Sequence, residues 1–231
     1  MHTVFRRSLL LLPAALAATV LFSIAPAGAQ VFSNTTMPIV PITSEELSKL
    51  PMTVDAEYTH VTGANGLTGK IEEHVGSAGM RVGGQVGILK YSNSGPTGFG
   101  AGVALSDPLK TLSHNSTTDV AVGLGGVAGF THASSDGVSE SSFGVRGLGM
   151  IGGSTRFGSG QVLWGQAGLG IDVVHTSAGD FSDTSTGAAL DLGAGFGITK
   201  QIQVEGEFNH DFANGGGDEV AAGVKFLLGA K

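Results

Sequence analysis

The stretch that decides the fold is residues 188–198, which read Ala188-Ala189-Leu190-Asp191-Leu192-Gly193-Ala194-Gly195-Phe196-Gly197-Ile198. From Ala188 onward every second residue is apolar, and the residues between them are alanine, aspartate or glycine. Consecutive side chains of an extended strand point to opposite faces, so the stretch predicts one apolar face and one small or acidic face. Eleven alternating residues suit a tilted strand that crosses a bilayer, which takes about 9–11 residues.

The same alternation recurs through the chain from residue 80 onward. It predicts eight strands, at residues 80–88, 98–105, 117–131, 139–152, 160–176, 188–198, 202–211 and 219–228. In the fourth strand the apolar positions change phase at Leu148 and Met150, which predicts a β-bulge near Gly147. We therefore predict an all-β fold, an antiparallel up-and-down transmembrane β-barrel of eight strands, with ten strands as the alternative.

The first 79 residues divide into two parts. Residues 1–29 carry Arg6 and Arg7, an apolar core and Ala27-Gly28-Ala29, which predicts an export signal peptide cleaved after Ala29. Residues 30–79 form either a leader or an extra hairpin, and residues 80–231 form the barrel domain. Beyond the signal no apolar run approaches the roughly 20 residues of a membrane helix, so any crossing has to use strands.

The two faces differ in what they carry. Glycine is abundant, with 39 residues in the chain, and it costs roughly 0.5–1 kcal/mol relative to alanine inside a strand. A crowded barrel interior explains these glycines, whereas a water-exposed surface does not. Seven charged residues are predicted to line the interior, because ions facing lipid would cost about 2–4 kcal/mol each: Arg81, Arg146, Asp172, Asp191, Glu205, Glu207 and Lys225. Asp119 and Glu219 lie either inside or at strand ends in water.

Composition excludes several classes of function. Removal of the signal leaves a net charge of −9, because it takes away two basic and no acidic residues, and this argues against a nucleic-acid partner. There is no cysteine, and the histidines show no metal-binding spacing. Residues 147–152 match G-x-G-x-x-G but lack a following helix. We expect no catalytic residues, no cofactor and no metal.

Two features concern the rims of the barrel. Thr199-Lys200 is a tight turn, whereas residues 132–138 and 177–183 are expected to be longer polar loops on the external side. Residues 107–116 depart from this rule, because they fall on the periplasmic side and yet span ten residues. Aromatic residues make up only 6% of the chain, which does not fit the aromatic girdles usual for such barrels.

The last 39 residues also carry a family resemblance. Residues 195–208, a glycine-rich loop and residues 220–226 resemble the closing hairpin of small bacterial outer-membrane barrels, namely the opacity proteins and the transmembrane domain of outer-membrane protein A. The resemblance implies a strand, a tight periplasmic turn, an acidic-inside strand, an external loop and a final strand. It does not select a role, because that family includes structural barrels, adhesins, narrow channels and lipid-modifying enzymes.

From these observations we expect an integral protein of the cell outer membrane without enzymatic activity. Its role would be structural or surface-interacting, with a narrow porin-like passage as a variant. One alternative is a lipid-modifying enzyme that uses His132 or His175 near an external serine, and another is a soluble periplasmic β-protein that binds a ligand. Expected partners are outer-membrane lipids, lipopolysaccharide and the barrel-assembly machinery, with any host or surface ligand unknown and with no nucleic acid.

Overall fold

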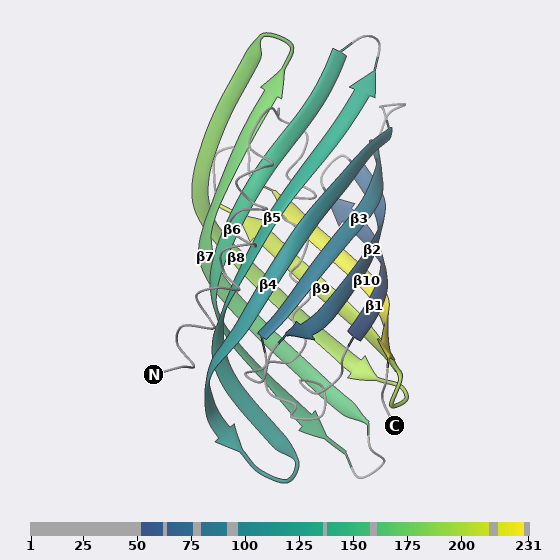
Figure 1. The fold of residues 1–231 in the computed structure, drawn as a ribbon, viewed down its shortest axis with the longest axis vertical. Coiled ribbons are helices and arrows are strands. Elements are labelled where there is room, and N and C mark those ends of the chain that lie inside the picture. The colour runs from purple at the N-terminus through teal and green to yellow at the C-terminus, as the bar shows by residue number, and fades with distance from the viewer. Residues whose placement is uncertain are drawn as a thin grey trace.

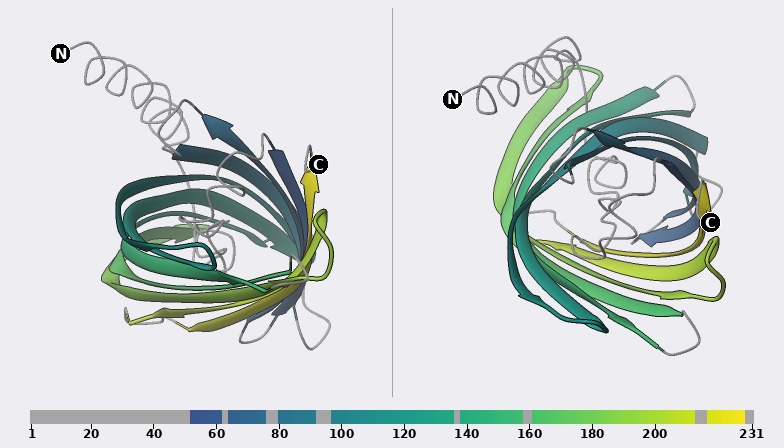
Figure 2. Two further views of the ribbon diagram at one scale, coloured as in Figure 1. Left: turned by 90° about the horizontal axis from the view of Figure 1, so that it is seen from below. Right: turned by 60° about the horizontal axis from the view of Figure 1, so that its bottom comes forward.

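The computed structural model describes residues 52–61, 64–75, 80–91, 97–135, 138–157, 161–212 and 217–228. These residues form one closed antiparallel β-barrel, in which each strand pairs with its neighbours in chain order and β1 pairs with β10 (Figures 1 and 2). The strands are β1 Met52–Val61, β2 Ala64–Val75, β3 Met80–Tyr91, β4 Thr97–His114, β5 Thr118–Ser135, β6 Val138–Arg156, β7 Val162–Ala178, β8 Phe181–Gly197, β9 Ile202–Asp211 and β10 Asp218–Leu228. No helix among these residues is long and apolar enough to cross a membrane.

The barrel has ten strands, so the expectation of eight is wrong and the alternative of ten is right. The two additional strands are β1 and β2, which come from the region left open between a leader and an extra hairpin. β1 closes the ring by pairing over its whole length with β10 on one side and β2 on the other. The predicted signal peptide, residues 1–29, and residues 30–51 lie outside the described part of the chain.

The register of the strands fixes their tilt. A row of directly paired residues that starts at Ala194 on β8 passes around the barrel and returns to β8 at Ser182, a shift of 12 residues. With about 3.3 Å per residue and 4.8 Å between strands, this shift over ten strands gives a tilt of about 40°. Such a tilt is typical of closed barrels and leaves no open sheet edge.

The outer face carries the apolar rows that the alternation predicted. Large apolar side chains are exposed on every strand, as Val86 is at 65% on β3 and Leu169 at 66% on β7. The residues between them are buried. On β8, for example, Ala189 and Asp191 are buried while Leu192 is exposed. The barrel is therefore apolar outside and polar inside, the reverse of a water-soluble barrel.

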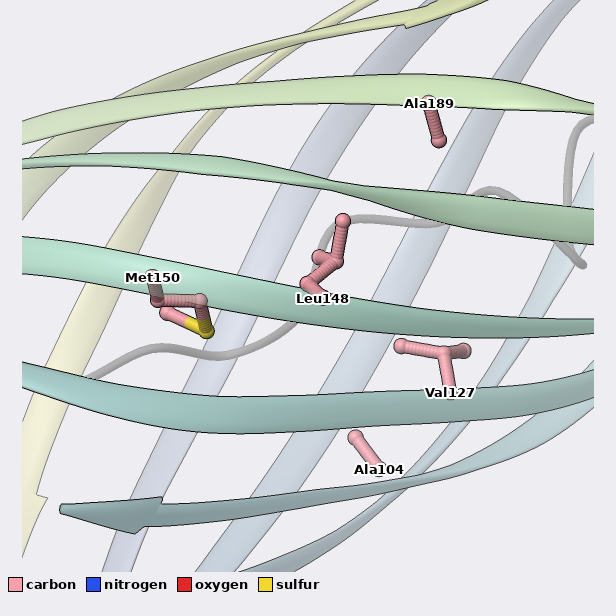
Figure 3. Close-up of a cluster of buried hydrophobic side chains, with 5 residues drawn as sticks. All are labelled: Ala104, Val127, Leu148, Met150 and Ala189. Carbon is pink, nitrogen blue, oxygen red and sulfur yellow. The ribbon is translucent and has the colours of Figure 1, made fainter. Parts of the chain in front are cut away.

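One part of the interior is apolar, and it corrects the predicted bulge. Pairing of β6 with β5 and with β7 runs through Gly147 without any register shift. Leu148 and Met150 instead stay on the inner face of β6, where they form a buried cluster with Ala104, Val127 and Ala189 (Figure 3). The change of apolar phase in the sequence thus marks a change in what the interior contains, not a change in the strand.

The expected contrast between short turns and long loops is also wrong. β5 continues to Ser135 and β7 to Ala178, so the predicted long loops are mostly paired strand. The connection between β7 and β8 is only Gly179-Asp180, where Gly179 has a positive φ of 57°, a conformation that suits glycine in a tight hairpin. β4 likewise continues to His114, with register shifts against β5 beyond Pro108. The β4–β5 hairpin extends beyond neighbouring strands at one end of the barrel, and the β5–β6 and β7–β8 hairpins do so at the other (Figure 1).

Candidate functional site

The barrel interior holds an excess of negative charge. Ten carboxylate side chains are buried in the described strands, against four buried cations, Lys70, Arg81, Arg146 and Lys225. The carboxylates are Asp55, Glu57, Glu72, Asp119, Asp172, Asp191, Glu205, Glu207, Asp211 and Glu219. Period-two alternation places them on one face of their strands, and closure of the sheet brings these faces together. Burial of so many ions requires close pairing.

Lys70 on β2 is the centre of the first group. Its Nζ lies 2.6 Å from Glu57 Oε1 on β1 and 3.5 Å from Glu207 Oε2 on β9. Glu57, Glu205 and Glu207 each offer a carboxylate oxygen within 4.8 Å of the other two, close enough to share a cation. The Lys70 ammonium already supplies a positive charge there, so the arrangement is a lysine–carboxylate network in its own right.

Lys225 on β10 is the centre of the second group. Its Nζ lies 2.8 Å from Glu205 Oε2, 3.7 Å from Asp55 Oδ2 and 3.8 Å from Glu72 Oε1. Glu72 in turn accepts a hydrogen bond from Arg81 Nε at 2.9 Å. The chain of ion pairs therefore joins β9, β10, β1, β2 and β3, and it runs across the seam where the barrel closes.

Arg146 on β6 forms a third group on the other side of the barrel. Its Nη2 donates to Asp172 Oδ2 on β7 at 3.0 Å, and its Nη1 donates to Asn209 Oδ1 on β9 at 3.1 Å. Arg146 and Asp172 are paired directly in the strand register, whereas Asn209 lies three strands away from β6. This arginine therefore reaches across the interior.

All seven charged residues predicted to face the interior are buried in the structure. Six of them take part in the three groups just described, and Asp191 is buried on β8 in register with Asn209. Asp119 and Glu219, for which the sequence left two positions open, are buried as well. Sequence reasoning missed five buried charged residues: Asp55, Glu57, Lys70 and Glu72 on β1 and β2, and Asp211 at the end of β9. The signal of the first four was present, because they alternate with Val54, Ala56 and Ile71.

Some buried carboxylate oxygens have no hydrogen-bond partner among the described residues. Both oxygens of Glu219 are of this kind, as is Oδ1 of Asp172. A buried carboxylate without donors is costly, so such atoms are normally satisfied by water, a cation or a proton.

The histidines form a separate set at the ends of strands. Five of the six histidines in the described strands pair through Nδ1 with the residue directly opposite on the next strand. The pairs are His60–Asn65, His114–Asp119, His132–Ser141, His175–Thr184 and His210–Asp218. His132, which the sequence proposed beside an external serine, indeed has Ser141 Oγ at 2.8 Å, whereas His175 faces a threonine hydroxyl at 2.7 Å.

Comparisons with known proteins give structural similarity at low identity. No family model matches the chain, and no curated protein does. Among solved structures, the outer membrane protease OmpT of Escherichia coli aligns at TM-score 0.38 and 11% identity, over 77% of this chain and 93% of that chain. The KdgM porin aligns at 0.32 and 12%, over 75% and 98%. Outer membrane phospholipase A of Escherichia coli aligns at 0.32 and 10%, over 81% and 98%. None of these similarities assigns the chain to a family.

Proposed function

We propose that the chain is an integral outer-membrane β-barrel with a structural or surface-interaction role. One observation carries the proposal: apolar side chains are exposed around the whole outer face of a closed barrel that buries fourteen charged side chains inside. A bilayer satisfies this arrangement, because acyl chains cover the apolar rows while the closed sheet pairs its own backbone groups. In water the same rows would form an exposed apolar surface far larger than soluble proteins tolerate.

The interior favours a structural role over a passage. Lys70 binds Glu207 and Arg146 binds Asn209 between strands that are not neighbours. Such contacts reach across the lumen, and the four buried cations are each less than 5% exposed. Ion pairs of this kind hold non-neighbouring strands of the barrel together and fill the space that a continuous column of water would need. We therefore expect little conductance from the folded barrel.

The long hairpins favour a role at the surface. β5, β6, β7 and β8 have 17–19 residues each, more than the roughly 9–11 that a crossing needs. The ends of these strands are rich in serine and threonine, as in residues 139–142 and 182–186. Paired polar hairpins that project beyond the apolar surface present a rigid face to a partner. Lipopolysaccharide and neighbouring surface molecules are the partners in reach.

The experiment that tests the proposal follows membrane insertion directly. Expression of the full chain in a Gram-negative host, followed by fractionation, should place the mature protein in the outer membrane with the signal removed. Unboiled samples should migrate differently from boiled ones on denaturing gels, as folded barrels do. A chain that fractionates with soluble periplasmic proteins, and stays monodisperse without detergent, would contradict the proposal and favour the soluble ligand-binding alternative.

A second candidate function is lipid modification, and the His132–Ser141 pair is the observation that favours it. A histidine in hydrogen-bond contact with a serine hydroxyl is the core of an acyl-transfer site, because the imidazole can take the proton from the attacking oxygen. The adjacent acid, Glu140, lies on the opposite face of β6, since consecutive residues alternate. Incubation with labelled phospholipid and lipopolysaccharide, comparing the parent with Ser141→Ala and His175→Ala, tests this candidate. Turnover lost only in Ser141→Ala would support it, and no turnover in the parent would remove it.

A further inference from the structure

The outward-facing histidines gather at one end of the barrel. His60, His132, His175 and His210, here called the histidine belt, lie on the outer face of β1, β5, β7 and β9, each within four residues of the end of its strand. All four ends belong to the rim opposite to the one where β1 begins and β10 ends. With the strand tilt of about 40°, the four rings lie within about 10 Å of one another along the barrel axis.

Each belt histidine stands beside an aromatic ring. The ring centroids of His132 and Phe99 are 5.5 Å apart, and those of His210 and Phe212 are 4.3 Å apart. His60 and Tyr58 both hydrogen-bond Asn65 Oδ1, and His175 is paired in register with Phe143. Histidine–aromatic pairs at this rim therefore partly take the place of an aromatic girdle, for which the chain has few aromatic residues. They lie directly above the exposed apolar rows.

All four belt histidines use Nδ1 in their cross-strand hydrogen bonds, so Nε2 is the nitrogen that can contact an outside ligand. Amide and carboxylate oxygens only accept hydrogen bonds, so Nδ1 of His60 donates to Asn65 at 2.8 Å and Nδ1 of His210 donates to Asp218 at 2.6 Å. This fixes the tautomer and leaves Nε2 to gain the proton. Once protonated, Nε2–H becomes a donor that carries positive charge. It then suits the oxygen of a phosphate.

We propose that the histidine belt binds the phosphate-bearing headgroups of anionic lipids in the leaflet at this rim, and that binding strengthens as the pH falls. The proposal rests on membrane insertion, as proposed above. Lipid headgroups are the occupants to which this position points, because the belt borders the apolar rows that acyl chains cover. Lys90 on β3 faces outward at the same rim and adds a permanent positive charge.

The side chains directly opposite the belt histidines on neighbouring strands are almost all uncharged, so the pH response of this rim comes from the histidines. Opposite His60 are Asn65 and Val220, opposite His132 are Phe99 and Ser141, and opposite His175 are Phe143 and Thr184. Opposite His210 are Leu190 and Asp218. Asp218 is the single charged residue among these eight.

The test measures lipid selectivity of the full mature chain in vesicles of phosphatidylcholine containing spin-labelled phosphatidylglycerol, whose phosphodiester stays singly charged in this range. Selectivity for the anionic label over a phosphatidylcholine label should be several-fold higher at about pH 5.5 than at about pH 7.5, where the permanent charge of Lys90 remains, since each cation beside an anionic surface is worth about fivefold in binding. The variant with His60, His132, His175 and His210 all changed to Gln should lose the pH dependence. His114→Gln at the opposite rim, where the histidine pairs across strands with the buried Asp119 on the inner face, is the control and should keep it.

Three results would overturn the proposal. They are a parent whose lipid selectivity does not depend on pH, a variant with all four histidines changed (the fourfold variant) whose selectivity still depends on pH, or loss of selectivity when inorganic phosphate is added as a competitor. Heat-modifiable migration is checked in every sample, so a failure to insert is recognised as a failure of the proposed function and not of lipid recognition. If the fourfold variant does not insert, the four single variants carry the measurement, with a partial loss of the pH response expected for each.

Discussion

The indole of Trp164 on β7 lies over the bare backbone of Gly195, which faces it in register on β8. Trp164 is buried inside the barrel, and its Nε1 donates to Gln203 Oε1 on β9 at 3.2 Å. A methyl group at position 195 would enter the space that the indole occupies. Gly195 is therefore needed because a large side chain from the neighbouring strand takes the place of its own.

This contact predicts that Gly195→Ala destabilises the barrel by about 1–3 kcal/mol, the usual cost of overpacking a filled interior. Urea unfolding of the refolded protein, followed by the heat-modifiable fraction, measures the change. Gly206→Ala is the matched control, because the nearest atom to the new methyl would be Ala221 O at an ordinary 3.7 Å, and no loss of stability is expected there. Equal effects at the two positions would refute the close-approach explanation.

Asp172→Asn should destabilise the barrel strongly, because it leaves the buried Arg146 guanidinium without its carboxylate partner. Breaking a buried ion pair on one side typically costs about 3–5 kcal/mol. Replacing both members by apolar residues of similar volume, with Arg146→Met and Asp172→Leu, should recover most of that loss. The urea midpoints of the parent, of Asp172→Asn and of the double variant test this prediction. An Asp172→Asn variant as stable as the parent would mean that the ion pair does not stabilise the interior.

Charge on the outer face should be penalised according to depth. Leu169 is exposed in the middle of β7, whereas Leu228 is the last residue of β10. Leu169→Arg should cost about 2–4 kcal/mol or block insertion, and Leu228→Arg should cost only about 0–1 kcal/mol. The measurement is unfolding from vesicles or, for non-inserting variants, the inserted fraction. Similar costs at both positions would not be compatible with a bilayer around the barrel.

Deletion of residues 52–79 removes β1 and β2 and tests the strand count. β3 and β10 are not paired with each other in the structure, so the deletion leaves two open edges and removes Asp55, Glu57, Lys70 and Glu72 from the ion network. Open edges are not tolerated in hydrocarbon. The shortened chain should show no heat-modifiable band, and a stable barrel formed by residues 80–231 alone would restore the eight-strand interpretation.

The faces of the strands could be predicted from the sequence because lipid and interior impose opposite demands at a period of two. Val86 outside and Gln85 inside on β3, or Leu192 outside and Asp191 inside on β8, follow directly from this alternation. The prediction failed where lipid no longer covers the outer face and so no longer demands apolar residues there. Beyond the apolar rows both faces of a hairpin contact water, so strands such as residues 107–114 lack the period and resemble loops in the sequence.

Two other differences have their own physical causes. Leu148 and Met150 face inward because part of the interior is filled by packing instead of ion pairs, so apolar residues occur on both faces of β6. Strands β1 and β2 were ambiguous because their outer rows are interrupted by His60 and Gly69. The four buried charged residues on these two strands therefore escaped the sequence analysis, and the extent of the ion network emerged only when the ring was closed.

The single tryptophan of the chain offers the most direct test of orientation. Mature protein is reconstituted in vesicles whose acyl chains carry bromine, which quenches nearby indole fluorescence. Emission from Trp164 in the parent should be quenched weakly, because the barrel wall separates its ring from lipid, and Leu169→Trp in a Trp164→Phe background should be quenched strongly. Strong quenching of Trp164 together with weak quenching at position 169 would contradict the assignment of an apolar outer face and a charged interior.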